Sequence, residues 1–241
     1  MSLSARKPTR RRALRRTYLV GAMLLTVLVV VVQMRFQHTE QRTAEVVAQL
    51  RFLRDELRAG AGERMQELFP EGYFFSHVLY GLTWTDVARQ SPVSKDEALR
   101  EARWALRRLD SADGRAPFDP TLRPAYGVFH AGWTNRLRGA VVGLAGPGAP
   151  ETARLRGECQ ALADAFADAL DRSEPFLPAY PGQAWPVDSV VAIAALRTHD
   201  RVTTPRFGAL IDRWVAVARE QVDPGTGLLW HQVTPSRDPA R

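Results

Sequence analysis

Apolar residues recur at steps of three and four through most of this chain, with charged residues between them. In residues 39–70, for example, Val46, Leu50, Leu53 and Leu57 fall on one face of a helix. No stretch alternates apolar and polar residues with the period of a strand. The pattern therefore predicts an all-α fold. Helices are expected within residues 39–70, 91–111, 125–146, 147–173, 187–198 and 204–221, and a short one at the end of the aromatic stretch 69–90.

One segment departs from this pattern, because residues 18–34 contain no charge at all. Seventeen residues are at the short end of what a transmembrane helix needs. A buried core helix and a cleavable signal peptide are the alternatives, but no A-x-A-like cleavage site follows closely. We interpret the segment as an uncleaved signal anchor that contacts membrane lipid.

The charge of +7 lies at the N-terminus. Residues 1–16 hold seven Lys and Arg and no acid, which leaves 26 basic and 26 acidic residues elsewhere. A neutral body gives no support for a nucleic-acid partner. The basic flank predicts a cytoplasmic N-terminus and a single-pass protein of the bacterial inner membrane. The expected parts are a basic cytoplasmic tail (1–17), a transmembrane signal anchor (18–34), a membrane-proximal helix (35–69) and a periplasmic or extracellular helical-hairpin domain (70–241).

Aromatic residues recur along that last part with a period near fifty. Three tryptophans are separated by 49 and 52 residues, and each follows a tyrosine. A period of this length, made of two helices, is typical of stacked helical hairpins. The pairs are Tyr80 and Trp84, Tyr126 and Trp133, and Tyr180 and Trp185.

The stretch YPGQAWPVDSVVAIAAL (180–196), followed about thirty residues later by DPGTGLLWHQV (223–233), resembles segments of the (α/α) toroid superfamily. That superfamily includes sugar epimerases, unsaturated glycan hydrolases, polysaccharide lyases and linalool dehydratase/isomerase-like proteins. The resemblance covers about residues 70–235 and implies inner helices whose aromatic loops ring a cavity. A full toroid has six or seven hairpins, and this chain has room for three or four. An incomplete ring implies a second copy or a partner that covers the open inner helices.

Polar residues near the expected helix starts are the candidate chemistry. Two carboxylates and two imidazoles could exchange protons, and Trp faces could stack on a sugar ring or enclose an apolar substrate. Asp188 could instead cap a helix, and His130 and the tryptophans could be core residues. The candidate catalytic set is Asp86, His130, Asp188 and His231. The candidate substrate-binding set is Tyr80, Trp84, Tyr126, Trp133, Tyr180, Trp185 and Trp230.

The residues and the resemblance together predict an enzyme that acts on a glycan or a small hydrophobic alcohol by elimination, epimerisation or hydrolysis. A non-catalytic helical scaffold or binding module, and a truncated relative without activity, remain as alternatives. Neither metal nor cofactor is expected, since no zinc-protease motif, phosphate loop or nucleophile elbow occurs and Cys159 is the single cysteine. The enzyme interpretation predicts that at least three of the four catalytic candidates face one pocket within roughly 10 Å.

Overall fold

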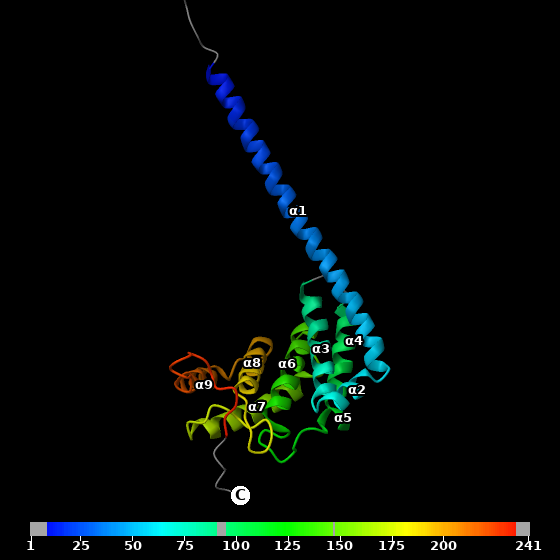
Figure 1. Cartoon of the computed structure of the whole chain (residues 1–241), viewed down its shortest axis with the longest axis vertical. Coiled ribbons are helices and arrows are strands. Elements are labelled where there is room, and N and C mark those ends of the chain that lie inside the picture. Colours follow the sequence, from blue (N-terminus) through cyan, green and yellow to red (C-terminus); the bar gives the residue numbers. More distant parts are fainter. Residues whose placement is uncertain (1–8, 91–94, 147, 235–241) are drawn as a thin grey trace, which may run out of the picture. The chain divides into compact units, whose positions relative to one another are not determined.

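A computed structural model describes residues 9–90, 95–146 and 148–234, apart from the side chains of residues 9–17, 19, 20, 22 and 30–42. Within these residues the only regular elements are helices, accompanied by isolated β-bridges (Figure 1). The predicted all-α fold is confirmed. The helices are α1 (Thr9–Arg58), α2 (Ala61–Leu68), α3 (Gly72–Gln90), α4 (Lys95–Leu109), α5 (Ala112–Arg115), α6 (Gly127–Ala145), α7 (Thr152–Leu170), α8 (Pro186–Val202) and α9 (Gly208–Glu220).

The chain forms two compact units, residues 1–49 and residues 50–241. Their boundary lies inside α1, whereas the sequence pattern placed the last domain boundary after residue 69. The predicted basic tail (1–17) lies outside the described side chains, and the predicted anchor (18–34) lies only partly within them. Among the described residues, no helix combines the length and the apolarity that crossing a membrane requires.

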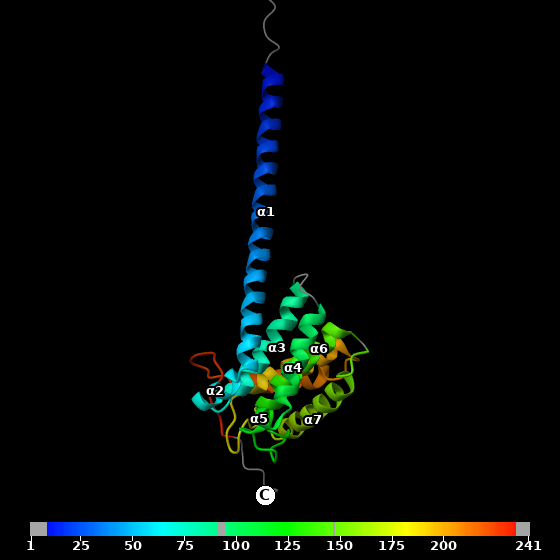
Figure 2. The same cartoon turned by 90° about the vertical axis from the view of Figure 1, so that its right-hand side faces the viewer.

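In the second unit α3 packs against α4, α6 packs against α7, and α9 packs against both α7 and α8 (Figures 1 and 2). Helix α6 also packs against α3 and α8, so it lies between these two helices. Early residues of α3 contact early residues of α6, as Phe74 does with His130. Late residues of α3 contact later residues of α6, as Arg89 does with the Ala140 carbonyl. Helices α6 and α8 advance in the same way, from Gly132 beside Ala192 to Gly143 beside Val202. All three helices are therefore parallel and begin at the same end of the unit.

A row of glycines brings α6 and α8 unusually close. A Cβ atom at Gly132 would lie 3.0 Å from the backbone N and Cα of Ala192. Farther along, a Cβ atom at Gly139 would lie 2.7 Å from Thr198 Cγ2, and one at Gly143 would lie 3.0 Å from Val202 Cγ1. Real Cβ contacts are rarely this short, so the helices approach to a distance that only glycine permits. This contact fixes the register of α6 against α8.

Helix α3 is longer than the pattern predicted. The short helix expected at the end of residues 69–90 is instead one continuous helix from Gly72 to Gln90. Its buried residues lie on several faces, because α2, α4 and α6 all pack against it. A helix buried on several sides shows no single apolar stripe, so its period is hidden in the sequence.

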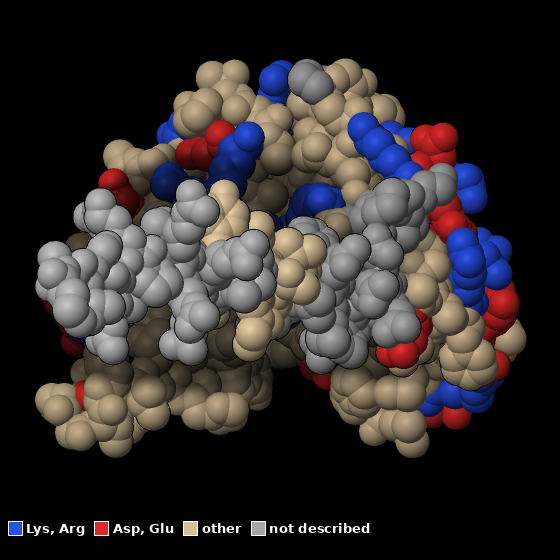
Figure 3. All heavy atoms as spheres, turned by 90° about the horizontal axis from the view of Figure 1, so that it is seen from above, with Lys and Arg blue, Asp and Glu red and all other residues tan. Residues whose placement is uncertain are grey.

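A buried arginine joins α6 to α7 and to the residue that follows α4. Arg138 is 3 % exposed, and its Nε donates to Glu158 of α7 at 3.0 Å. It also contacts Asp110, which follows α4 and accepts hydrogen bonds from Arg154 at 2.6 Å. A buried guanidinium needs such partners, since an unpaired buried charge is strongly destabilising. On the face shown in Figure 3, Lys and Arg are interspersed with Asp and Glu rather than gathered in one basic field.

Substituting Gly132 tests the close approach of α6 and α8. Both Gly132→Ala and Gly157→Ala add one methyl group to a helix, and a Cβ at Gly157 meets nothing within 4 Å. The gain in helix propensity, about 1 kcal/mol, is common to both. We expect Gly132→Ala to be less stable than Gly157→Ala by about 1–3 kcal/mol, the usual cost of overpacking. Urea unfolding of the two variants measures that difference, and equal free energies of unfolding would refute the close contact.

Candidate functional site

The beginnings of α3, α6 and α8 meet at one end of the second unit. Phe75 near the start of α3 contacts Phe129 in the first turn of α6, with ring centroids 5.1 Å apart. A Cβ at Gly127, the first residue of α6, would lie 2.3 Å from the carbonyl oxygen of Ala179 in the loop before α8. Parallel neighbouring helices thus bring together side chains that are more than fifty residues apart in the sequence.

Two carboxylates and a phenol lie at this junction. Glu71 directly precedes α3, and its carboxylate accepts a hydrogen bond from the Tyr180 hydroxyl. Asp188, in the first turn of α8, is 7 % exposed. Burial, assisted by the negative charge of Glu71, raises the pKa of Asp188 from 3.8 to about 6. We name Glu71, Tyr180 and Asp188 the carboxyl cluster.

The carboxyl cluster holds groups in different protonation states near neutral pH. Burial and the Glu71 carboxylate raise the pKa of Tyr180, so its phenol stays protonated and donates to Glu71. Asp188 titrates within two units of neutrality and can both hold and release a proton. A carboxyl group whose pKa is raised by burial, as that of Asp188 is, is a typical component of acid–base sites.

His130 lies close by, in the first turn of α6, and is buried. Burial lowers the pKa of His130 to about 4, so the imidazole is neutral at physiological pH. Its ring packs against Phe74, Phe118 and Tyr126 at centroid distances of 5.2–5.3 Å. Its Nε2 atom has no hydrogen-bond partner among the described residues. His130 is therefore a neutral polar group within an aromatic shell.

Partly exposed aromatic side chains surround these groups. We name Phe75, Tyr126, Trp133 and Trp185 the aromatic rim, since each is only half-buried. Trp185 contacts Tyr180 at 5.7 Å between ring centroids, and Trp133 contacts Phe75 at 5.9 Å. Tyr126 has a φ of 68°, a left-handed conformation that is uncommon for a residue other than glycine. Such strain concentrates at binding and catalytic sites.

The structure places the first predicted aromatic pair elsewhere. Helix α3 begins at Gly72 and not near residue 84. Trp84 and Asp86 therefore lie at least about three helical turns after the start of α3. Asp86 is exposed and pairs with Arg89 at 2.9 Å. Tyr80 is buried and donates to Glu101 of α4 at 2.8 Å, and Trp84 is fully buried. The prediction that these residues stand at a helix start is wrong.

The C-terminal candidates, Trp230 and His231, make no side-chain hydrogen bond or ring contact with the carboxyl cluster within the described residues. Both side chains are exposed. Their segment is tethered two residues later, where Val233 and Ala184 exchange backbone hydrogen bonds of 2.9 and 3.2 Å. The structure thus brings His130 and Asp188 to one end of the unit and leaves Asp86 outside that junction, whereas the exposed His231 lies two residues from the backbone pairing of Val233 with Ala184.

The alternative interpretation of Asp188 as a helix cap is wrong. Helix α8 has Trp185 as its N-cap residue and Pro186 as its first residue, so Asp188 is third and makes no capping hydrogen bond. Its buried position has another cause, the packing of the loop before α8 against the start of α3. Glu71 and Phe75 were missed in the sequence, and an earlier start for α3 within FPEGYFF would have identified both.

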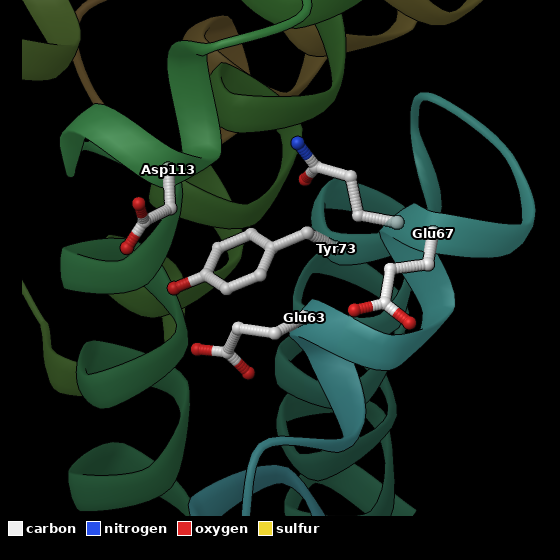
Figure 4. Close-up of a pocket in the computed structure, with 5 residues that line it drawn as sticks. Glu63, Glu67, Tyr73 and Asp113 are labelled. Carbon is white, nitrogen blue, oxygen red and sulfur yellow. The ribbon is translucent and has the colours of Figure 1, made fainter.

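Two pockets in the second unit lie apart from these groups. One, of about 270 Å³, is lined by Glu63, Gln66, Glu67, Tyr73 and Asp113 (Figure 4). The other, of about 350 Å³, is lined by Arg156, His199, Thr204 and Arg206. Neither lining includes a predicted site residue. Within the described residues, no cluster of three or more His, Cys, Asp or Glu side chains is placed to hold a metal ion.

Comparison with known proteins gives no relative: no family model, curated protein or solved structure matches this chain. The roles of the carboxyl cluster and the aromatic rim are therefore argued from geometry and electrostatics.

The raised pKa of Asp188 predicts a pH-dependent stability. The unfolded chain ionises this carboxyl near pH 3.8 and the folded protein near pH 6, so folding opposes ionisation. The resulting destabilisation is absent below pH 3.8, grows between the two values and is complete above pH 6, where it reaches about 3 kcal/mol.

Asp188→Asn should remove this penalty. We expect the variant to gain stability over the parent above pH 6 and to match it near pH 3, as measured by thermal unfolding across the pH range. Asp86→Asn is the control, because an exposed ion pair contributes less than about 1 kcal/mol. The same pH profile for parent and Asp188→Asn would contradict the buried, ionisable state of Asp188.

Proposed function

We propose that the second unit is an incomplete (α/α) toroid of three hairpins, with the carboxyl cluster as an acid–base site for a hydroxylated ligand. The ligand class is a glycan or a small hydrophobic alcohol. The single observation that carries the proposal is the junction of Glu71, Tyr180 and Asp188 beneath a partly exposed aromatic rim. In this arrangement Trp185 and Trp133 stack on a ring or enclose an apolar chain.

The chemistry follows from the charges. Asp188, whose pKa is raised to about 6, donates a proton to a leaving or rearranging hydroxyl. The Glu71 side chain, which accepts the Tyr180 hydrogen bond, receives a proton either directly or through the Tyr180 phenol. General acid–base catalysis of this kind contributes about 10²–10⁴-fold to a rate. Elimination, epimerisation and hydrolysis all use such a pair.

A second function, non-catalytic binding, is favoured by a different observation. Three large apolar residues are exposed on two of the parallel helices: Leu79 on α3, and Val187 and Val190 on α8. Val187 and Val190 are one helical turn apart and share a face. Exposed apolar side chains on these helices suit a partner or a second copy of the chain, as an open ring requires.

We further propose that residues 18–34 anchor the protein in the bacterial inner membrane, with the basic tail in the cytoplasm and the second unit outside it. The exposure of consecutive large side chains supports this. Met23, Leu24, Leu25, Val27, Leu28 and Val29 are 51–70 % exposed, and seven successive positions cover every face of a helix. Apolar exposure on all faces is unfavourable in water and favourable in lipid.

Ligand binding and turnover test the acid–base site. The full chain in mild detergent is titrated with cellohexaose, maltohexaose, chitohexaose and linalool, with tryptophan fluorescence for binding and mass spectrometry for products. We expect Trp185→Ala to weaken binding by about tenfold, in line with 1.4 kcal/mol of lost contact. Trp230→Ala is the matched control, since Trp230 is exposed and outside the aromatic rim.

Asp188→Asn separates catalysis from binding. If the site is catalytic, turnover of the bound ligand falls by about 10²–10⁴-fold and affinity is retained, while Asp86→Asn keeps full activity. Retained turnover in Asp188→Asn would eliminate the acid–base role. Binding without turnover in the parent protein would favour the second function.

Membrane association tests the anchor. Leu25→Arg/Val29→Arg places two charges in the segment, each costing about 2.5–3.5 kcal/mol near the bilayer centre. We expect the parent to stay in the membrane fraction after carbonate extraction and this variant to be released. Phe52→Arg/Leu53→Arg is the control, because those exposed residues lie outside the segment. Release of the parent protein itself would disprove the anchor.

A further inference from the structure

The pocket lined by Arg156, His199, Thr204 and Arg206 carries an inference that is independent of the proposed function. It lies between α7, the end of α8 and the loop before α9, and its volume is about 350 Å³. Sites for small ligands have volumes of roughly 300–1,000 Å³. The lining contributes two guanidinium groups, a hydroxyl and an imidazole, and no carboxylate.

The two arginines differ from most others in the second unit. Arg154, two residues before Arg156 on α7, is bound to both Asp110 and Glu158 at 2.6 Å. Arg156 and Arg206 make no ion pair within the described residues, and both are exposed. Two unneutralised cations on one pocket repel each other and attract an anion.

Arg206 is held in place without use of its hydrogen-bond donors. Its guanidinium carbon lies 5.5 Å from the centre of the Phe207 ring. A cation–π contact of this kind needs none of the guanidinium N–H donors, and no hydrogen bond of the Arg206 side chain occurs among the described residues. The backbone amides of Arg206 and Phe207 donate to the two carboxylate oxygens of Asp200 at 3.1 and 2.9 Å.

Asp200 therefore orders the pocket wall through backbone amides, and within the described residues it forms no ion pair with Arg156 or Arg206. Besides those two amides, its carboxylate contacts Nδ1 of the buried His199 at 3.0 Å. These three interactions fix the turn that precedes α9, so the loop residues Thr204 and Arg206 are positioned before a ligand arrives. A site ordered in advance loses less entropy on binding.

We propose that this pocket binds a phosphate group. Arginine presents paired N–H donors that match two phosphate oxygens, and Arg156 and Arg206 approach from different elements. Thr204 supplies a hydroxyl donor. The volume exceeds what inorganic phosphate occupies, so the ligand is a phosphomonoester, either soluble or as the headgroup of a lipid.

Calorimetric titration of the full chain in mild detergent with inorganic phosphate tests the site, at constant ionic strength. We expect saturable binding that Arg156→Gln/Arg206→Gln weakens by about tenfold or more, since each arginine contributes charge-assisted hydrogen bonds. Arg201→Gln is the matched control, because Arg201 is exposed at the same end of α8 and does not line the pocket. Circular dichroism verifies folding, and Arg156→Gln alone serves if the double variant is unfolded.

A titration with chloride at the same ionic strength measures how much of the response comes from nonspecific anion binding. An equal response to chloride, or equal phosphate affinity in the parent and the pocket variants, would overturn the proposal. Glycerol 3-phosphate and vesicles containing phosphatidic acid distinguish the two sources. Tighter binding of glycerol 3-phosphate assigns a soluble ligand, and tighter binding of the vesicles assigns a lipid headgroup.

Discussion

The approach of α6 to α8 is the constraint from which the rest of the second unit follows. Gly132 lies against the backbone of Ala192, and a Cβ atom at that position requires the two helices to move apart by a few tenths of an ångström. Because both helices run in the same direction, a fixed contact at this level also fixes their first turns. His130 lies two residues before Gly132, and Asp188 lies four residues before Ala192. The glycine contact thus determines which polar side chains reach the same end.

Burial at that end is what gives the carboxyl cluster its chemical character. The loop before α8 packs on the start of α3, which removes Asp188 from water and places it near Glu71. On an isolated, solvated helix the pKa of Asp188 would not be raised in this way. The Tyr180 hydroxyl compensates Glu71, whereas the buried charge of Asp188 opposes folding above pH 6. A buried carboxyl that lowers stability at neutral pH is a physical reason to test this end of the unit for function.

The sequence pattern predicted the helical class and most amphipathic helices, because α4, α7 and α9 each bury one face. It failed at α3, where several neighbours bury several faces and the period disappears. That error shifted Trp84 and Asp86 to a helix start they do not occupy and hid Glu71. It did place Tyr126, His130, Trp133, Tyr180, Trp185 and Asp188 near the starts of two helices, since Gly127 and Pro186 mark the starts of α6 and α8. The partnership of Asp188 with Glu71 is a long-range contact that local spacing does not encode.

The same reasoning explains why the arginine pocket was not visible in the sequence. Arg154 and Arg156 stand two residues apart on α7, on different faces of that helix, and nothing local distinguishes them. Only the tertiary structure shows that Arg154 meets Asp110 and Glu158, whereas Arg156 faces the loop before α9. Residues 17–241 contain equal numbers of acidic and basic residues. In such a protein, local positive charge arises where arginines have no neighbouring carboxylate. A balanced net charge gives no support for a broad basic surface, yet it is compatible with a local anion site built from two unpaired arginines.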